Sequence, residues 1–162
     1  MENTNQTAGT QVAEAAGHQR EEDTRKLLRE CNAGIKMGMD SIDEVMPSVR
    51  DDRLRRILEQ CRREHADLGD ETHELLLRWG ADTKDPHPIA KGMSWLTTNV
   101  KLQWGQSDKT VAGIMSDGCH MGVKSLNGYL NEYADADSKA RSVTRKLIDI
   151  EERMSDRMTA YL

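Results

Sequence analysis

Apolar residues recur every three or four positions along most of this chain, which is the period of an amphipathic helix. The first such stretch ends before Pro47, whose ring cannot continue a helix, and the second ends at Gly80. The inward positions of the first stretch are Leu28, Cys31, Ile35, Gly38, Ile42 and Val45. Those of the second are Leu54, Leu58, Cys61, His65, Leu68, Thr72 and Leu75.

The second half of the chain repeats this arrangement. Ser107 is placed to cap a third long helix, and a break at residues 134–137 precedes a fourth. The third helix would carry Val111, Met115, Gly118, Cys119, Gly122, Leu126, Tyr129 and Tyr133 on or near its inward face. The fourth would carry Val143, Leu147, Ile150, Met154, Met158 and Tyr161.

Between the two halves, residues 81–88 contain two prolines and read as a connection. A shorter amphipathic helix follows, ended by Gly105 and lined by Ile89, Met93, Leu96, Val100 and Trp104. Together these elements predict an all-α fold. It is an up-down four-helix bundle of two helix hairpins, joined by a long crossover that contains a short fifth helix, which is the ferritin-like connectivity.

The N-terminal segment differs from the rest of the chain. Residues 1–20 are rich in Asn, Gln, Thr, Ala and Gly and lack bulky apolar side chains, so we expect a disordered tail there. Residues 21–162 form the predicted bundle.

An internal repeat supports two related hairpins. The segment from Cys31 to Lys36 (CNAGIK) recurs as Cys119 to Lys124 (CHMGVK), in each case ahead of a helix break. A chance similarity between two amphipathic helices is the alternative explanation. The repeat makes Cys31 and Cys119 equivalent positions.

The chain resembles the uncharacterised ferritin-like bundle proteins of bacteria, which are relatives of the rubrerythrin and ferritin superfamily. The resemblance runs from residue 21 to 162 and rests on four segments: Glu30–Ile35, Arg62–Leu68, Gly92–Leu102 and Leu126–Tyr129. It implies the four-helix fold. In catalytic members, two Glu residues and two Glu-x-x-His motifs hold a pair of metal ions.

That ligand set is missing here. No Glu is followed by a His three positions later, and Arg62 stands where a Glu before His65 would be needed. Two near misses exist: Asp70-x-x-His73 lies late in the second helix, and Asp117-x-x-His120 lies in the third rather than in the fourth, which faces the second. A standard di-iron carboxylate centre is therefore not expected.

Cysteines fall near the middle of the predicted bundle instead. Counting from the break at Pro47, Cys31 and His65 should lie level, with Cys61 one turn away. Counting back from residue 136 places Cys119 opposite Glu151 and Glu152. Thiolate and imidazole ligands suit zinc or iron, so one hypothesis is a metal site of Cys31, Cys61, His65 and Cys119, with Glu151 as a further ligand. The alternative is that these cysteines only pack as small apolar side chains.

Composition limits the remaining function classes. The net charge of −5 argues against nucleic-acid binding, and no apolar run approaches the roughly 20 residues that span a bilayer. The N-terminus does not read as a secretory signal, and three well-separated cysteines suit a reducing cytoplasm.

These observations leave two functional readings. The first is a non-enzymatic bundle with a structural or protein-interaction role, as a homodimer or with another protein partner, and with no cofactor. The second is a Zn or Fe protein, or a thiol redox protein, that uses the central Cys and His residues. The sequence leans away from an enzyme.

Overall fold

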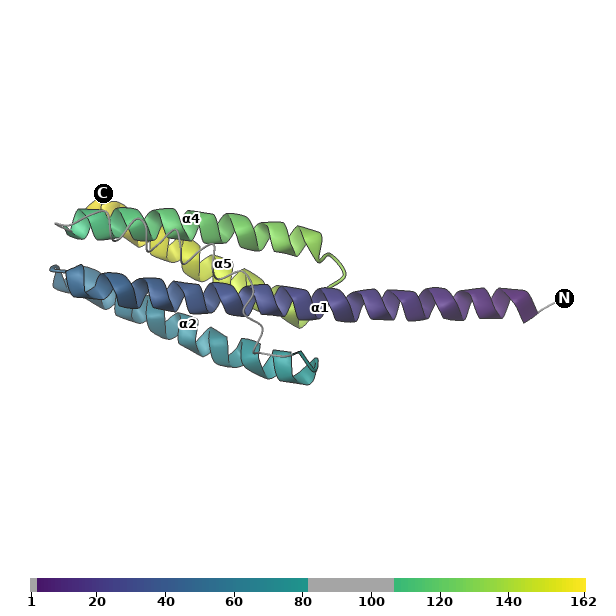
Figure 1. The fold of residues 1–162 in the computed structure, drawn as a ribbon. Coiled ribbons are helices and arrows are strands. Elements are labelled where there is room, and N and C mark those ends of the chain that lie inside the picture. Colours follow the sequence, from purple (N-terminus) through teal and green to yellow (C-terminus); the bar gives the residue numbers. More distant parts are fainter. Residues whose placement is uncertain (1–2, 82–106) are drawn as a thin grey trace.

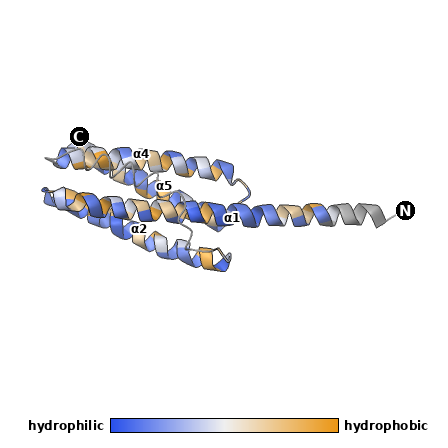
Figure 2. Cartoon of the chain, in the orientation of Figure 1, coloured by the Kyte–Doolittle hydropathy of each residue, from blue (hydrophilic) through white to orange (hydrophobic). Residues whose placement is uncertain are grey.

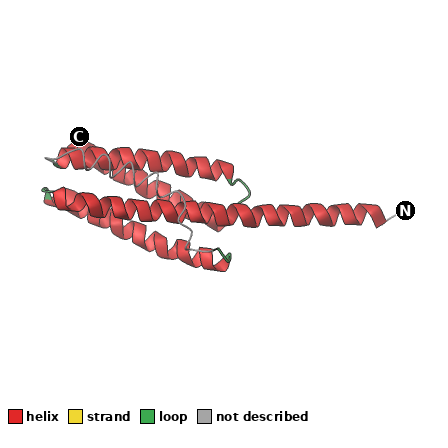
Figure 3. Cartoon of the chain, in the orientation of Figure 1, coloured by secondary structure: helices red, strands yellow, loops and turns green. Residues whose placement is uncertain are grey.

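The computed structural model describes residues 3–81 and 107–162, and within them it contains helices and no strands. The four long helices are α1 (Asn3–Val45), α2 (Asp52–Arg78), α4 (Asp108–Glu132) and α5 (Ser138–Met158) (Figures 1 and 3). Short 3-10 turns, Met46–Ser48 and Thr159–Tyr161, follow α1 and α5. The all-α prediction is confirmed. The predicted crossover and its short fifth helix fall outside the described residues.

The helices form two antiparallel hairpins whose turns lie at opposite ends of the bundle. The end of α2 lies beside the middle of α1, where Arg25 Nε donates to the Trp79 carbonyl over 2.7 Å. The start of α4 lies at the α1–α2 turn, where Asp108 accepts the backbone N–H groups of Arg50 and Asp51. The chain therefore enters α4 at the end opposite to the one where it leaves α2, and these two helices run parallel.

One apolar core runs through this bundle. Both α2 and α4 pack against α1 and α5, and α1 also contacts α5 across the bundle. Hydrophobic residues are spaced along every helix (Figure 2), and the buried ones join into a single cluster. The inward stripes predicted from the sequence supply most of that cluster.

Three of the helix ends are fixed by short polar contacts. Asp51 accepts the N–H of Leu54 at the start of α2, and Ser107 accepts that of Thr110 at the start of α4. Asp137 caps α5 in the same way. Gly80, with φ of +59°, adopts the left-handed conformation that ends α2.

The N-terminal segment differs from the sequence prediction. Residues 1–20 were expected to form a disordered tail, whereas α1 begins at Asn3 and projects well beyond the bundle (Figure 1). Its side chains from Gln11 to Arg20 are exposed. A helix propagates readily from an ordered nucleus, and the Ala- and Gln-rich composition favours this extension. Packing against other helices begins near Arg20, which pairs with Asp137.

A ladder of polar pairs sets the register between the two hairpins. Acidic or amide groups on α2 meet basic groups on α5 in three pairs: Gln60–Arg157, Glu64–Arg153 and Glu71–Lys146. Each step along α2 equals the step back along α5, as antiparallel helices require. Exposed pairs of this kind contribute little energy individually. In the same antiparallel alignment, His65 of α2 lies against Glu151 of α5, within one residue of the position that this offset gives.

None of the helices in the described residues is long and apolar enough to cross a bilayer.

A candidate functional site at the bundle centre

Four polar side chains meet in the middle of the apolar core, and we call them the central polar layer: Cys61, His65, Cys119 and Glu151. Helix α2 supplies the first two, α4 the thiol of Cys119, and α5 the carboxylate. His65 is fully buried and Glu151 is 7% exposed. A buried ionisable group is costly unless it is paired, so the bonding within this layer decides what it can do.

Both ring nitrogens of His65 are engaged. Nδ1 lies 2.9 Å from the carbonyl oxygen of Cys61, and because a carbonyl only accepts, Nδ1 carries a proton and donates it. Nε2 lies 3.0 Å from Oε1 of Glu151. The Cys61 sulfur is 3.7 Å from Nδ1. The ring is therefore held between its own helix on one side and α5 on the other.

The pKa of His65 shows which effect dominates. Burial alone lowers the pKa, but hydrogen bonds to Cys61 and Glu151 and the negative charge of Glu151 outweigh it. The pKa is raised from 6.5 to about 10. At neutral pH the layer therefore holds an imidazolium–carboxylate pair, and this pair joins the two hairpins.

Two thiols of the core, Cys31 and Cys119, are held in their neutral form. Burial, the charge of Glu151 and a hydrogen bond to that carboxylate raise the pKa of Cys119 far above its ordinary value. Burial also raises the pKa of Cys31 to about 12, despite hydrogen bonds with Thr144 and Thr72. Since the thiolate is the reactive and metal-binding form, both residues are inert thiols at neutral pH.

A glycine on α1 makes room for the His65 ring, and a glycine on α4 lies beside Glu151. A Cβ atom added at Gly38 of α1 would lie 2.5 Å from Nε2 of His65. The nearest atom to a Cβ at Gly122 of α4 would be the Glu151 carboxyl carbon at 3.7 Å, an ordinary contact. All four helices thus shape the layer. At both glycines the nearest atoms belong to side chains of another helix rather than to its backbone.

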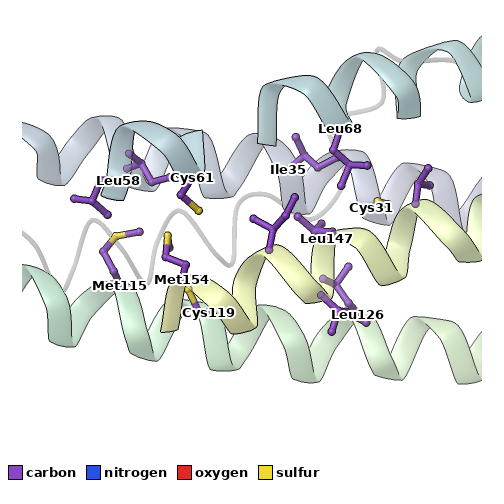
Figure 4. Packing of buried hydrophobic residues seen from close by; sticks show 14 of the residues in the cluster. Cys31, Ile35, Leu58, Cys61, Leu68, Met115, Cys119, Leu126, Leu147 and Met154 are labelled. Atoms are coloured by element: carbon purple, nitrogen blue, oxygen red, sulfur yellow. The ribbon is translucent and has the colours of Figure 1, made fainter. Parts of the chain in front are cut away.

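The structure brings together four of the five residues predicted for a metal site. Cys119 and Glu151 lie opposite each other, as counting from the α4–α5 turn predicted. The prediction that Cys31 lies level with His65 is wrong, because Cys31 contacts Thr72 and Thr144 instead. Figure 4 shows Cys31 well separated from Cys61 and Cys119 along the bundle.

The error lies in the assumed position of the first turn. Contacts across the α1–α2 hairpin, such as Gly38–His65 and Ile35–Gly69, are centred on residues 51 and 52 rather than on Pro47. The helical path continues through the 3-10 turn Met46–Ser48 before the chain reverses. This moves the partner of Cys31 along α2 by about two helical turns.

The layer as it stands is bonded internally rather than open to an ion. Among residues 3–81 and 107–162, no three His, Cys, Asp or Glu side chains are grouped to hold a metal ion. The physical reason is that Cys61 and Glu151 lie at different nitrogens of the His65 ring, so one ion cannot meet both through that ring. Arg62, at the vacant motif position, points outward and pairs with Asp43 of α1.

The sequence did not identify Thr72 and Thr144 as the buried polar neighbours of Cys31. Thr72 and Thr144 are fully buried, and each hydroxyl donates to a carbonyl one turn back in its own helix. Thr72 had been placed on the inward stripe, but nothing in the spacing linked it to Cys31. Gly38 is a glycine in a helix interior, and its cost in helix propensity is a sequence signal for a close neighbour.

Substitution of Gly38 tests whether the His65 ring depends on that space. Gly38→Ala should lower the free energy of unfolding by about 1–3 kcal/mol, because the added methyl collides with a ring pinned on both sides. Gly122→Ala is the matched control and should gain up to about 1 kcal/mol from helix propensity. Urea unfolding measures both. A stabilising Gly38→Ala would contradict the observed packing.

The ion pair also predicts how stability depends on pH. The folded pKa of His65 lies above its unfolded value, so the stabilisation is complete below about pH 6.5 and declines as pH rises toward 10. The free energy of unfolding, measured by urea titration between pH 6.5 and about 8.5, should therefore fall. His65→Gln should flatten this dependence. An unchanged slope in that variant would show that another group is responsible.

Comparison with known proteins adds evidence on the fold. No protein-family profile matches the sequence, and neither does any curated protein. The structure is similar to the crystal structure of a DUF305 fragment from Deinococcus radiodurans, with a TM-score of 0.68 and 11% sequence identity. The similarity covers 85% of this chain and 93% of that chain. It supports the helical architecture and carries no statement about activity.

Proposed function

We propose that this chain is a non-enzymatic helical bundle with a structural or protein-interaction role. The observation that carries the proposal is the closed central polar layer. Both nitrogens of His65 have partners, Glu151 is paired, and Cys119 is held as a neutral thiol. His65, Glu151 and Cys119 are thus engaged with one another or with the backbone rather than presented to a substrate.

The surface supports a role in contacts with other proteins. The extension of α1 exposes a helix with no partner in the described part of the chain between Gln11 and Gln19. Large apolar side chains are also exposed on it and at the end of α2, namely Val12 at 70% and Leu77 at 62%. An unpacked helix of this length is marginal alone in water, and contact with a partner would stabilise it.

We further propose ferritin-like connectivity without the di-iron carboxylate site. Two hairpins with turns at opposite ends, and parallel α2 and α4, are what one long crossover along the bundle would produce. The residue at the second motif position is Met154, three after Glu151, where a His would be required. Helix α2 therefore carries only the His of a Glu-x-x-His motif, and α5 carries only the Glu.

A metal-binding or thiol redox protein is the second candidate. One specific observation favours it: Cys61, His65, Cys119 and Glu151 come from three helices into one layer. Zn or Fe would have to displace the protons of Cys119 and of His65 Nε2, and break the His65–Glu151 hydrogen bond. Cys31 is too remote to take part.

Elemental analysis separates the two candidates. The chain purified without chelators should contain less than about 0.1 equivalent of Zn or Fe, because the layer is satisfied by its own protons. Its thermal midpoint should not change on addition of a chelator. Stoichiometric metal that is lost in Cys119→Ser would overturn the first proposal in favour of the second. Cys31→Ser is the matched control, since that thiol lies outside the layer.

A further inference from the structure

The geometry points to self-association through the outward surface of α2. We propose that four residues, which we call the α2 outer face, pair in antiparallel fashion with the same face of a second copy: Arg56, Arg63, Asp67 and Glu74. The inference rests on the proposed protein-interaction role and names its partner and surface. The proposed interface lies on the exposed side of α2, away from the central polar layer.

Within the described part of the chain, these four side chains are free to meet a partner. Each is exposed, whereas the opposite side of α2 carries the buried residues of the core. None forms an ion pair within the described residues, although Glu64 and Glu71 on the neighbouring face are paired to α5. Figure 1 shows α2 along one edge of the bundle.

Their spacing makes the face complementary to itself. Arg56 and Arg63 are seven residues apart, as are Asp67 and Glu74, and positions seven apart share a helix face. The pattern is symmetric about residue 65. When two copies lie antiparallel about that centre, each Arg63 faces the other Asp67, and each Arg56 faces the other Glu74. A twofold interface requires this self-complementarity.

The stability of α2 itself does not explain this charge order. A helix favours negative charge near its N-terminus and positive charge near its C-terminus. The outer face has the reverse order, with its arginines in the N-terminal half and its acidic residues in the C-terminal half. The order therefore runs against the helix dipole. Apart from the weak attraction that Arg63 and Asp67 can have four positions apart, its gain is the four ion pairs of the antiparallel pair.

A second copy of this chain is the occupant that fits best. A partner would need acidic groups and then basic groups at the same seven-residue spacing, and α2 itself provides them. The face has little apolar area and exposed ion pairs are weak, so the dimer is expected to be weak and sensitive to salt. Glu59 and Asp70 flank the face and lie beside its pairs rather than within them.

Sedimentation velocity of the full chain over a range of protein concentrations tests the interface. Self-association should be present at about 0.02 M salt and strongly reduced at about 0.5 M. Arg56→Glu/Arg63→Glu should lower the association constant by at least about tenfold, and Asp67→Arg/Glu74→Arg should do the same. An equimolar mixture of these two variants should associate again. The variant that carries all four substitutions should associate with copies of itself, because every ion pair is then present with its charges exchanged.

Lys139→Glu/Arg145→Glu on α5 is the matched control, with the same change in net charge at exposed positions. It should associate like the unmodified chain, and circular dichroism should show unchanged helicity for every variant. A monomer at all concentrations in low salt would overturn the interface. A dimer that the α2 variants do not weaken would also overturn it, while leaving the proposed protein-interaction role intact.

Discussion

Within the described residues, the core depends on one buried charged pair at a position where apolar side chains would be simpler to bury. His65 on α2 and Glu151 on α5 belong to different hairpins, and their hydrogen bond is the central polar link between them. A buried charge without its partner is strongly destabilising. Other arrangements of the two hairpins would leave one or both charges unpaired, so the pair selects one register from the many that an apolar stripe alone would allow.

The rest of the structure accommodates this requirement. The ladder of polar pairs between α2 and α5 holds the same offset along the helices. Gly38 gives up helix propensity to leave space for the imidazole, and Cys119 hydrogen-bonds the carboxylate from α4. These features favour one arrangement of the two hairpins over the alternatives. Where a ferritin-like resemblance suggests carboxylate and histidine ligands for a metal pair, this chain has a network of hydrogen bonds centred on His65.

Much of the fold could be predicted from the sequence, because the three- and four-residue period of apolar side chains reports directly on helices and their inward faces. Positions across the second hairpin were also predictable, since residues 134–137 mark its turn well. The first hairpin was misjudged because Pro47 was taken as the turn, although the helical path continues past it. Which nitrogen of His65 meets which group depends on register and rotamer, and a single sequence does not encode these in a readable pattern.

A double-mutant cycle between His65 and Glu151 tests the central claim most directly. His65→Leu, Glu151→Leu and the double variant would be compared with the unmodified chain by urea unfolding at pH 6.5. The account predicts that each single variant loses about 3–5 kcal/mol, and that the double variant is more stable than either. Additive losses in the double variant would contradict it, because the two side chains would then act independently rather than as a pair.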